Sequence, residues 1–117
     1  MRRNVLVSIQ AILQNMRDAE QFIQGMTYEQ FVAGKKTMNA VLRSIDVSGE
    51  ADQRVPDDVR AQYPQIPWKE MAGMRDKAIR LYFSVDNETV WLVGKERIPS
   101  LQPLIEQIVC DLEVQGT

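Results

Sequence analysis

The sequence predicts an all-α protein, an up-and-down antiparallel bundle of four to five helices. Apolar residues recur at spacings of three and four along most of the chain, and strand-like alternation is almost absent. The breaks between these periodic segments are short, as the connections of an antiparallel bundle are. With 117 residues, 44% of them hydrophobic, the chain has the size of one domain, which we expect to cover residues 1–117.

The first two helices are predicted from their periodicity and from the residues between them. The first covers about residues 3–24 and ends near Gly25. Thr27 is the predicted N-cap of the second, and Gln30, three residues later, completes a capping box. Gly34 and Gly49 lie inside the second helix, where we favour close packing of another backbone over a local kink. The expected inner faces contain Val5, Ile9, Ile12, Leu13, Met16, Ala19, Phe22 and Ile23, followed by Phe31, Met38, Val41, Leu42 and Ile45.

Prolines divide the second half of the chain. Those at positions 56, 64 and 67 leave room only for a short helix over about residues 57–63. Pro67 suits the first turn of a third long helix, and Asp86 is a predicted N-cap for a fourth element that Pro99 interrupts. A last helix follows, with Cys110 in its core-facing stripe. The third helix is expected to present one face made of Trp68, Met71, Ala72, Arg75, Ile79, Tyr82 and Phe83, with Trp68 and later Trp91 as core anchors.

Charge and composition exclude several classes of protein. A formal net charge of −2 argues against nucleic-acid binding through overall positive charge. Residues 69–80 nevertheless form a local basic patch, although a solvated helix face would show the same pattern. One cysteine and no histidine leave no internal disulfide and no zinc-ligand set. No apolar run approaches the roughly 20 residues of a membrane span, and no signal peptide is visible, so we expect a cytoplasmic protein.

Two polar-tipped side chains share the apolar face of the third helix. Tyr82 lies seven positions after Arg75 and therefore about two turns away on the same side. Arg80 is rotated by roughly 140° from Arg75 about the helix axis. Both guanidinium groups can therefore contact one ligand only if a side chain reaches around the helix or if the two arginines come from different subunits. An arginine on an apolar face needs an acid, a wet cleft or a phosphate. The simplest alternative is an ion pair within the protein, for which the candidate acids are Glu50, Glu70 and Asp76.

Six short segments, taken in their order and spacing, resemble one known family. They are Tyr28 to Phe31, Ser48-Gly49-Glu50-Ala51, Tyr63 to Trp68, Gly73-Met74-Arg75, Tyr82 to Asp86, and Val90-Trp91. Together they resemble the HepT-like toxins of the HEPN superfamily, and the match covers most of the chain. The resemblance implies a helical bundle that pairs as a homodimer.

The family motif R-x4-H-x-Y falls on Arg75, Arg80 and Tyr82, so Arg80 stands where the family has histidine, and Asp76 stands where it usually has a polar amide. The resemblance implies a metal-independent endoribonuclease without a cofactor, which acts on tRNA-like RNA at a cleft between the two copies of a dimer. Arginine cannot replace the histidine as a base, because guanidinium stays protonated. Glu50 and Asp76 are alternative bases, although the sequence alone does not place either of them at the site. The candidate catalytic residues are Arg75, Asp76, Arg80 and Tyr82, and Lys69 and Lys77 are candidate RNA contacts.

The resemblance also implies a protein partner. HepT-like toxins are typically encoded with an MNT-type nucleotidyltransferase antitoxin that adds AMP to the motif tyrosine, which makes Tyr82 the expected modification site. Two interpretations follow from the missing histidine: an endoribonuclease toxin that still cleaves RNA, or an impaired binding or scaffold subunit that keeps the dimer and the partner surface. A structural dimer without any ligand is a third.

Overall fold

The computed structural model describes residues 2–84 and 86–116, with side chains for residues 4–84 and 86–114. Val85, part of one matching segment, lies outside the described residues. The elements in order are α1 (Arg2–Ile23), α2 (Tyr28–Ala33), α3 (Lys35–Asp52), α4 (Asp57–Gln62), α5 (Trp68–Ala72), α6 (Met74–Ser84), α7 (Asn87–Leu92), the π-helical turn η1 (Val93–Arg97) and α8 (Ile98–Gly116). The described residues contain helices and no strand, which confirms the all-α class.

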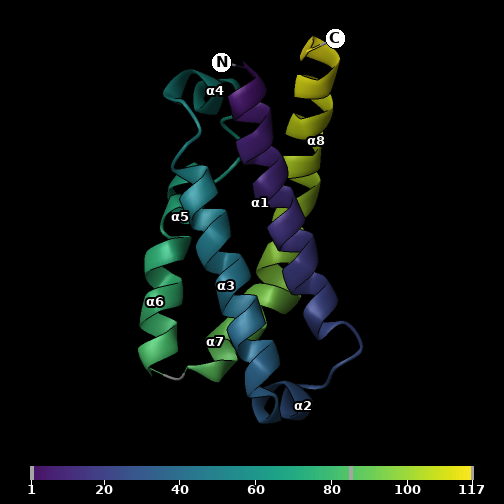
Figure 1. Cartoon of the computed structure of the whole chain (residues 1–117), viewed down its shortest axis with the longest axis vertical. Coiled ribbons are helices and arrows are strands. Elements are labelled where there is room, and N and C mark those ends of the chain that lie inside the picture. The colour runs from purple at the N-terminus through teal and green to yellow at the C-terminus, as the bar shows by residue number, and fades with distance from the viewer. Residues whose placement is uncertain (1, 85, 117) are drawn as a thin grey trace.

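The long helices α1, α3, α6 and α8 alternate in direction, as the sequence predicts for an up-and-down bundle (Figure 1). α1 packs against α3 on one side and α8 on the other, and α3 in turn packs against α6. α1 begins and α8 ends at the same end of the bundle (Figure 1). The spatial order α8, α1, α3, α6 therefore places α6 at the edge of the molecule, with one flank on α3. The core contains Ile9, Ile12, Met16, Ile23, Phe31, Val41, Ile45, Met71, Ile105 and Ile108, all almost completely buried.

Both predicted N-caps are confirmed. The Thr27 Oγ1 accepts a hydrogen bond from the Gln30 backbone N–H at 3.2 Å, and the Gln30 side chain accepts one from the Thr27 N–H at 2.9 Å. The Asp86 carboxylate accepts from the Thr89 N–H at 3.1 Å and from the Thr89 hydroxyl at 2.7 Å. These bonds hold the pKa of Asp86 below its usual range. Each cap satisfies backbone donors that a helix start leaves unpaired.

The predicted second helix is two helices, because the chain leaves helical geometry at Gly34 (φ −100°, ψ 81°). The close packing expected at Gly34 is wrong: the nearest neighbour of an added Cβ would be the Gln30 carbonyl of the preceding turn, at 3.4 Å. The chain turns at this residue, so that α2 lies across the lower end of α3 (Figure 1). The third predicted helix is likewise divided at Gly73 into α5 and α6.

Pro99 does not interrupt the chain's last helical stretch, contrary to the prediction. The turn η1 before it has π-type hydrogen bonding, in which the Ile98 N–H donates to the Val93 carbonyl five residues earlier. Pro99 follows this turn as the second residue of α8. The helical stretch consequently continues from Asn87 to Gly116.

Several side chains face the other way from the prediction. Cys110 is exposed, because Ile108 and Leu112 take the inner face of α8 and a residue two positions from each points outward. On α6 the buried residues are Met74, Ala78 and Leu81, whereas the predicted stripe is turned toward solvent. Phe22, expected on the inner face of the first helix, is exposed, and so are Ile79, Tyr82 and Phe83 of the apolar face predicted for the third helix. Trp68 is buried as predicted, and Trp91 packs partly buried against the core.

Candidate functional site

The start of α6 is held unusually close to α3. Gly49 is buried in α3, and a Cβ added there would lie 2.5 Å from the Arg75 backbone nitrogen and 3.1 Å from the Arg75 Cβ. No side chain fits at such a distance, so only glycine permits this approach. The close packing predicted for Gly49 is thereby confirmed. As a consequence Arg75, in the first turn of α6, lies directly beside the polar side chains of α3.

Arg75 is bound by two carboxylates of α3. Its Nη1 donates a hydrogen bond to the Glu50 Oε2 at 2.6 Å, and its Nε lies 3.5 Å from the Asp46 Oδ1. Asp46 and Glu50 are four residues apart and therefore adjacent on one helix face. The Arg75 side chain remains 48% exposed, so these contacts leave part of the guanidinium open to solvent. The alternative of an ion pair within the protein is thus realised with Glu50, one of the three acids considered.

Further charges extend this cluster along α3. Arg43 lies 3.5 Å from Asp46, and Arg54 lies 3.5 Å from Glu50. We call the five residues Arg43, Asp46, Glu50, Arg54 and Arg75 the arginine–carboxylate cluster; three positive and two negative side chains leave it with a net charge of +1. Exposed pairs of this kind add only about 0 to 1 kcal/mol each to stability. The cluster is therefore better suited to presenting charge than to holding the fold together.

Sequence reasoning missed Asp46, Arg43 and Arg54. A signal for them exists, because positions 43, 46, 50 and 54 repeat at spacings of three and four and so form a charged stripe on one side of a helix. The stripe becomes informative only once α6 is known to lie against that side of α3.

Tyr82 projects from the same flank of α6 into a shallow groove. One hollow of about 250 Å³ is lined by Asn39, Leu42, Asp46, Ile79 and Tyr82, among others, and so connects the tyrosine to the arginine–carboxylate cluster. A second hollow, of about 450 Å³, continues on the other side of Tyr82 between α3 and α7. The Tyr82 side chain is 55% exposed. The predicted common face of Arg75 and Tyr82 is thus at the surface, where Tyr82 lines the groove and Arg75 contacts Asp46 at its edge.

The other candidate residues of α5 and α6 lie outside this groove. Asp76 and Arg80 are exposed, and Arg80 lies on the side of α6 opposite its buried face. Lys77 lines a separate hollow on the far flank of α6 together with Glu70 and Arg97. Lys69 is exposed on α5. Within one copy of the chain, the two arginines of the motif therefore do not converge.

Glu70, one of the acids considered as a partner of Arg75, pairs with another arginine. It forms a two-pronged ion pair with Arg97, in which the Arg97 Nη2 lies 2.6 Å from the Glu70 Oε1 and the Nε contacts the Oε2. The hydrogen bonds from Arg97 hold the pKa of Glu70 below its usual range. This pair joins α5 to the π-helical turn η1.

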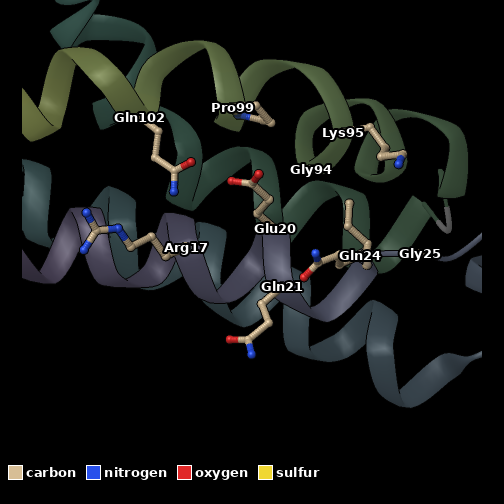
Figure 2. A pocket seen from close by; sticks show the side chains of 10 residues that line it. Arg17, Glu20, Gln21, Gln24, Gly25, Gly94, Lys95, Pro99 and Gln102 are labelled. Carbon is tan, nitrogen blue, oxygen red and sulfur yellow. The ribbon is translucent and has the colours of Figure 1, made fainter.

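A polar hollow of about 400 Å³ lies at the other side of the bundle, between the end of α1 and α8. Figure 2 shows that Glu20 from α1 and Gln102 from α8 both point into the space between these helices. Arg17 at its edge is paired with Glu106 at 3.5 Å, and the Lys95 ammonium lies 5.4 Å from the centre of the Trp91 ring. None of the candidate catalytic, modification or RNA-binding residues predicted from the sequence lines this hollow.

Within the described part of the chain, no helix combines the length and the apolar character needed to cross a membrane. Across these same residues, no group of three or more His, Cys, Asp or Glu side chains is arranged to bind a metal ion.

Fold and site together define an all-α bundle with a partly free arginine at the start of an edge helix, beside a groove that contains a tyrosine. Comparison with known families identifies it further. The chain belongs to the ribonuclease HepT-like family, whose model matches residues 12–108. The resemblance stated from the sequence is confirmed. No solved structure gives a significant match.

Relatives along nearly the whole chain are found in archaea and bacteria. A protein of Methanocaldococcus jannaschii named as a candidate RNase is 44% identical over 112 residues, covering 96% of this chain and 97% of its own. A protein of Thermococcus cleftensis named as a candidate ribonuclease HepT is 39% identical over 108 residues, covering 92% and 98%. A candidate RNase of Caldanaerobacter subterraneus is 34% identical over 101 residues, covering 86% and 90%.

Proposed function

We propose that this protein is the toxin of a toxin–antitoxin pair, a metal-independent endoribonuclease that cleaves tRNA-like RNA at a cleft shared by two copies of the chain. Membership of a ribonuclease family and the names of the relatives support RNA as the substrate. The observation that carries the proposal is the placement of Arg75, which is held by Glu50 and Asp46 while about half of its side chain stays exposed beside a groove.

Arg75 supplies the positive charge that phosphodiester cleavage needs. Attack on the phosphorus atom builds negative charge on the phosphoryl oxygens, and a fixed guanidinium stabilises that charge through paired N–H donors. The carboxylates of α3 hold the Arg75 side chain in one orientation, so less conformational freedom is lost when a phosphate binds. Arg80 contributes from the second copy in this proposal, and Lys69 and Lys77 contact RNA outside the groove.

The homodimer is proposed on the apolar surface of α6. We call Ile79, Tyr82 and Phe83 the α6 apolar patch; their exposed fractions are 48%, 55% and 78%, and Phe83 packs edge-on against Tyr82 with ring centres 5.4 Å apart. Clustered aromatic side chains in solvent are typical of interaction surfaces. Pairing through this patch would bring Arg80 of one copy toward the groove of the other.

The activity is tested with purified protein, bulk tRNA and no added metal, next to an Arg80→His variant. Cleavage by the unaltered protein, lost in Arg75→Ala, is the expected result. An Arg75→Lys variant keeps the charge but not the paired donors, and we expect it to be strongly impaired as well. A folded, dimeric protein that leaves RNA intact would contradict the proposal.

A second candidate function is an impaired HepT-like subunit that binds RNA or a partner without cleaving. The observation that favours it is Arg80 at the histidine position in a chain that contains no histidine. Loss of a positioned acid or base lowers rates by about 10² to 10⁴. Cleavage that appears only in the Arg80→His variant would support this second function, and cleavage by both proteins would reject it.

The proposed antitoxin is an MNT-type nucleotidyltransferase that adds AMP to Tyr82. The exposed phenol of Tyr82, in a groove next to Asn39 and Lys35, supports this choice of acceptor. Incubation with such an enzyme and ATP should raise the mass of the chain by AMP units. A Tyr82→Phe variant that still gains them would remove Tyr82 from this role.

A further inference from the structure

We propose that Glu50 is the general base of the RNA cleavage, taking the role that histidine has in the family motif. This inference rests on the proposed ribonuclease function and names a residue that the motif does not include. It starts from the absence of any histidine in the chain, so that carboxylates are the side chains left to accept a proton at neutral pH.

The position of Glu50 relative to Arg75 carries the inference. The Glu50 Oε2 lies 2.6 Å from the Arg75 Nη1, and the Glu50 side chain is 42% exposed. A phosphate held by the remaining N–H groups of Arg75 would place the neighbouring ribose within hydrogen-bond range of that carboxylate. Glu50 therefore adjoins the proposed phosphate site and is open to the substrate.

The cleavage consumes no reactant besides the RNA, because water only passes on a proton. The Glu50 carboxylate takes the proton of the ribose 2′-hydroxyl, and the 2′-oxygen forms a bond to phosphorus. The bond from phosphorus to the 5′-oxygen breaks, its electron pair stays on that oxygen, and water protonates it. The hydroxide left behind takes the proton from Glu50, so the products are a 2′,3′-cyclic phosphate and a 5′-hydroxyl. Arg75 stabilises the charge on the phosphoryl oxygens throughout.

The other nearby acids are less suitable. Asp46 and Glu50 each have a second arginine at 3.5 Å, Arg43 and Arg54 respectively, but Asp46 is 3.5 Å from the Arg75 Nε whereas Glu50 is 2.6 Å from the Nη1. Asp76 follows Arg75 on the same helix and is therefore rotated by about 100° from it, away from α3. Glu70 is fully engaged by Arg97. Of these carboxylates, Glu50 has the shortest contact with Arg75.

The test measures kcat/KM for a defined RNA against pH in four proteins: unaltered, Glu50→Gln, Asp46→Asn and the matched control Glu113→Gln, an exposed residue of α8. We expect Glu50→Gln to lower kcat/KM by about 10² to 10⁴ and to abolish the fall in rate toward acidic pH. Asp46→Asn should lower the rate less and keep that fall. Glu113→Gln should match the unaltered protein. Circular dichroism verifies that each variant is folded.

A rescue experiment separates proton transfer from mere positioning of Arg75. Added formate should restore part of the activity of Glu50→Ala and none of that of Arg75→Ala. Suppose that the unaltered protein cleaves RNA and that Glu50→Gln has the same kcat/KM and the same decrease in kcat/KM toward acidic pH. Glu50 is then not the base, and the ribonuclease proposal stands. If the unaltered protein does not cleave RNA, the ribonuclease proposal itself fails and this inference fails with it.

Discussion

Asp52 at the end of α3 is a fully buried carboxylate with no hydrogen bond to either side-chain oxygen among the described residues. The Arg60 guanidinium lies 3.6 Å from it but donates to backbone carbonyls, to that of Asp52 at 2.8 Å and that of Val55 at 3.0 Å. Arg60 also lies over the Trp68 ring, 5.7 Å from its centre. Arg60 therefore satisfies the end of the helix, and the Asp52 carboxylate is left poorly solvated.

Burial raises the pKa of Asp52 from 3.8 to about 6, although the nearby Arg60 opposes the shift. In the folded state Asp52 thus keeps its proton to higher pH than in the unfolded chain, so its contribution to stability is present below about pH 4 and is lost as pH rises through about 6. We expect Asp52→Asn to remove this loss and to stabilise the protein at pH 8, on the order of 2 to 3 kcal/mol relative to its effect at pH 4. Urea unfolding at both pH values measures it.

The control for this prediction is Asp58→Asn, which alters an exposed carboxylate of the neighbouring α4. Its effect on the free energy of unfolding should be small. An Asp52→Asn effect of the same size at pH 4 and pH 8 would show that the carboxyl group does not titrate between the two.

At the scale of elements, the contact between α3 and α6 decides the geometry of the site. The two helices touch through the Gly49 backbone, which leaves no room for a side chain beside Arg75. The Glu70–Arg97 pair fixes α5 to η1 on the opposite flank. Gly49 sets the distance of α6 from α3, and the burial of Met74, Ala78 and Leu81 sets the rotation of α6 about its axis.

Replacing Gly49 by alanine is expected to separate α3 from α6. The added methyl group would lie 2.5 Å from the Arg75 nitrogen, so the helices must move apart, at a cost of about 1 to 3 kcal/mol in the free energy of unfolding. The shift also lengthens the Arg75–Glu50 hydrogen bond and should lower RNA cleavage more than stability alone explains. Thermal unfolding and cleavage assays measure the two effects.

Gly73→Ala is the matched control, because Gly73 has nearly helical geometry (φ −77°, ψ −7°) and an added Cβ would meet only ordinary contacts at 3.5 and 3.6 Å. We expect no change or a gain of about 0.4 to 1 kcal/mol there. Equal melting temperatures for Gly49→Ala and the unaltered protein would mean that the close approach of the helices is not needed.

At the scale of the whole molecule, α6 lies at the edge of the bundle (Figure 1). Its apolar patch is exposed to solvent. We expect the protein to form a dimer through this patch, and Phe83→Glu to give a monomer, because a charge at the centre of an apolar contact is strongly unfavourable. Size-exclusion chromatography with light scattering measures the mass. Val7→Glu, which alters an exposed apolar residue of α1, should remain dimeric.

A dimer that survives Phe83→Glu would place the interface elsewhere. Its effect on RNA cleavage is also informative: if the cleft is shared, loss of the dimer should abolish cleavage while each copy stays folded.

Much of the fold could be predicted because local signals dominate it. The helical periodicity, the Thr27 capping box and the Asp86 cap act within a few residues, and the structure contains each of them. The continuation of the helix through Pro99 could not be predicted, because it depends on a change of hydrogen-bond register in the preceding turn. That Ile79 and Phe83 are exposed beside Tyr82 could not be predicted, because an apolar stripe does not reveal whether it faces the core or a surface.

The sequence by itself determined the helical class, the caps and the HepT-like family, since these depend on residue identity and on short spacings. Only the tertiary structure decided which acid meets Arg75 and on which side Tyr82 lies. The physical reason is that the rotation of α6 about its axis is set by contacts between residues distant in the chain. At Gly49 a missing side chain lets two backbones meet, and this places Arg75 on Glu50, 25 residues earlier in the chain.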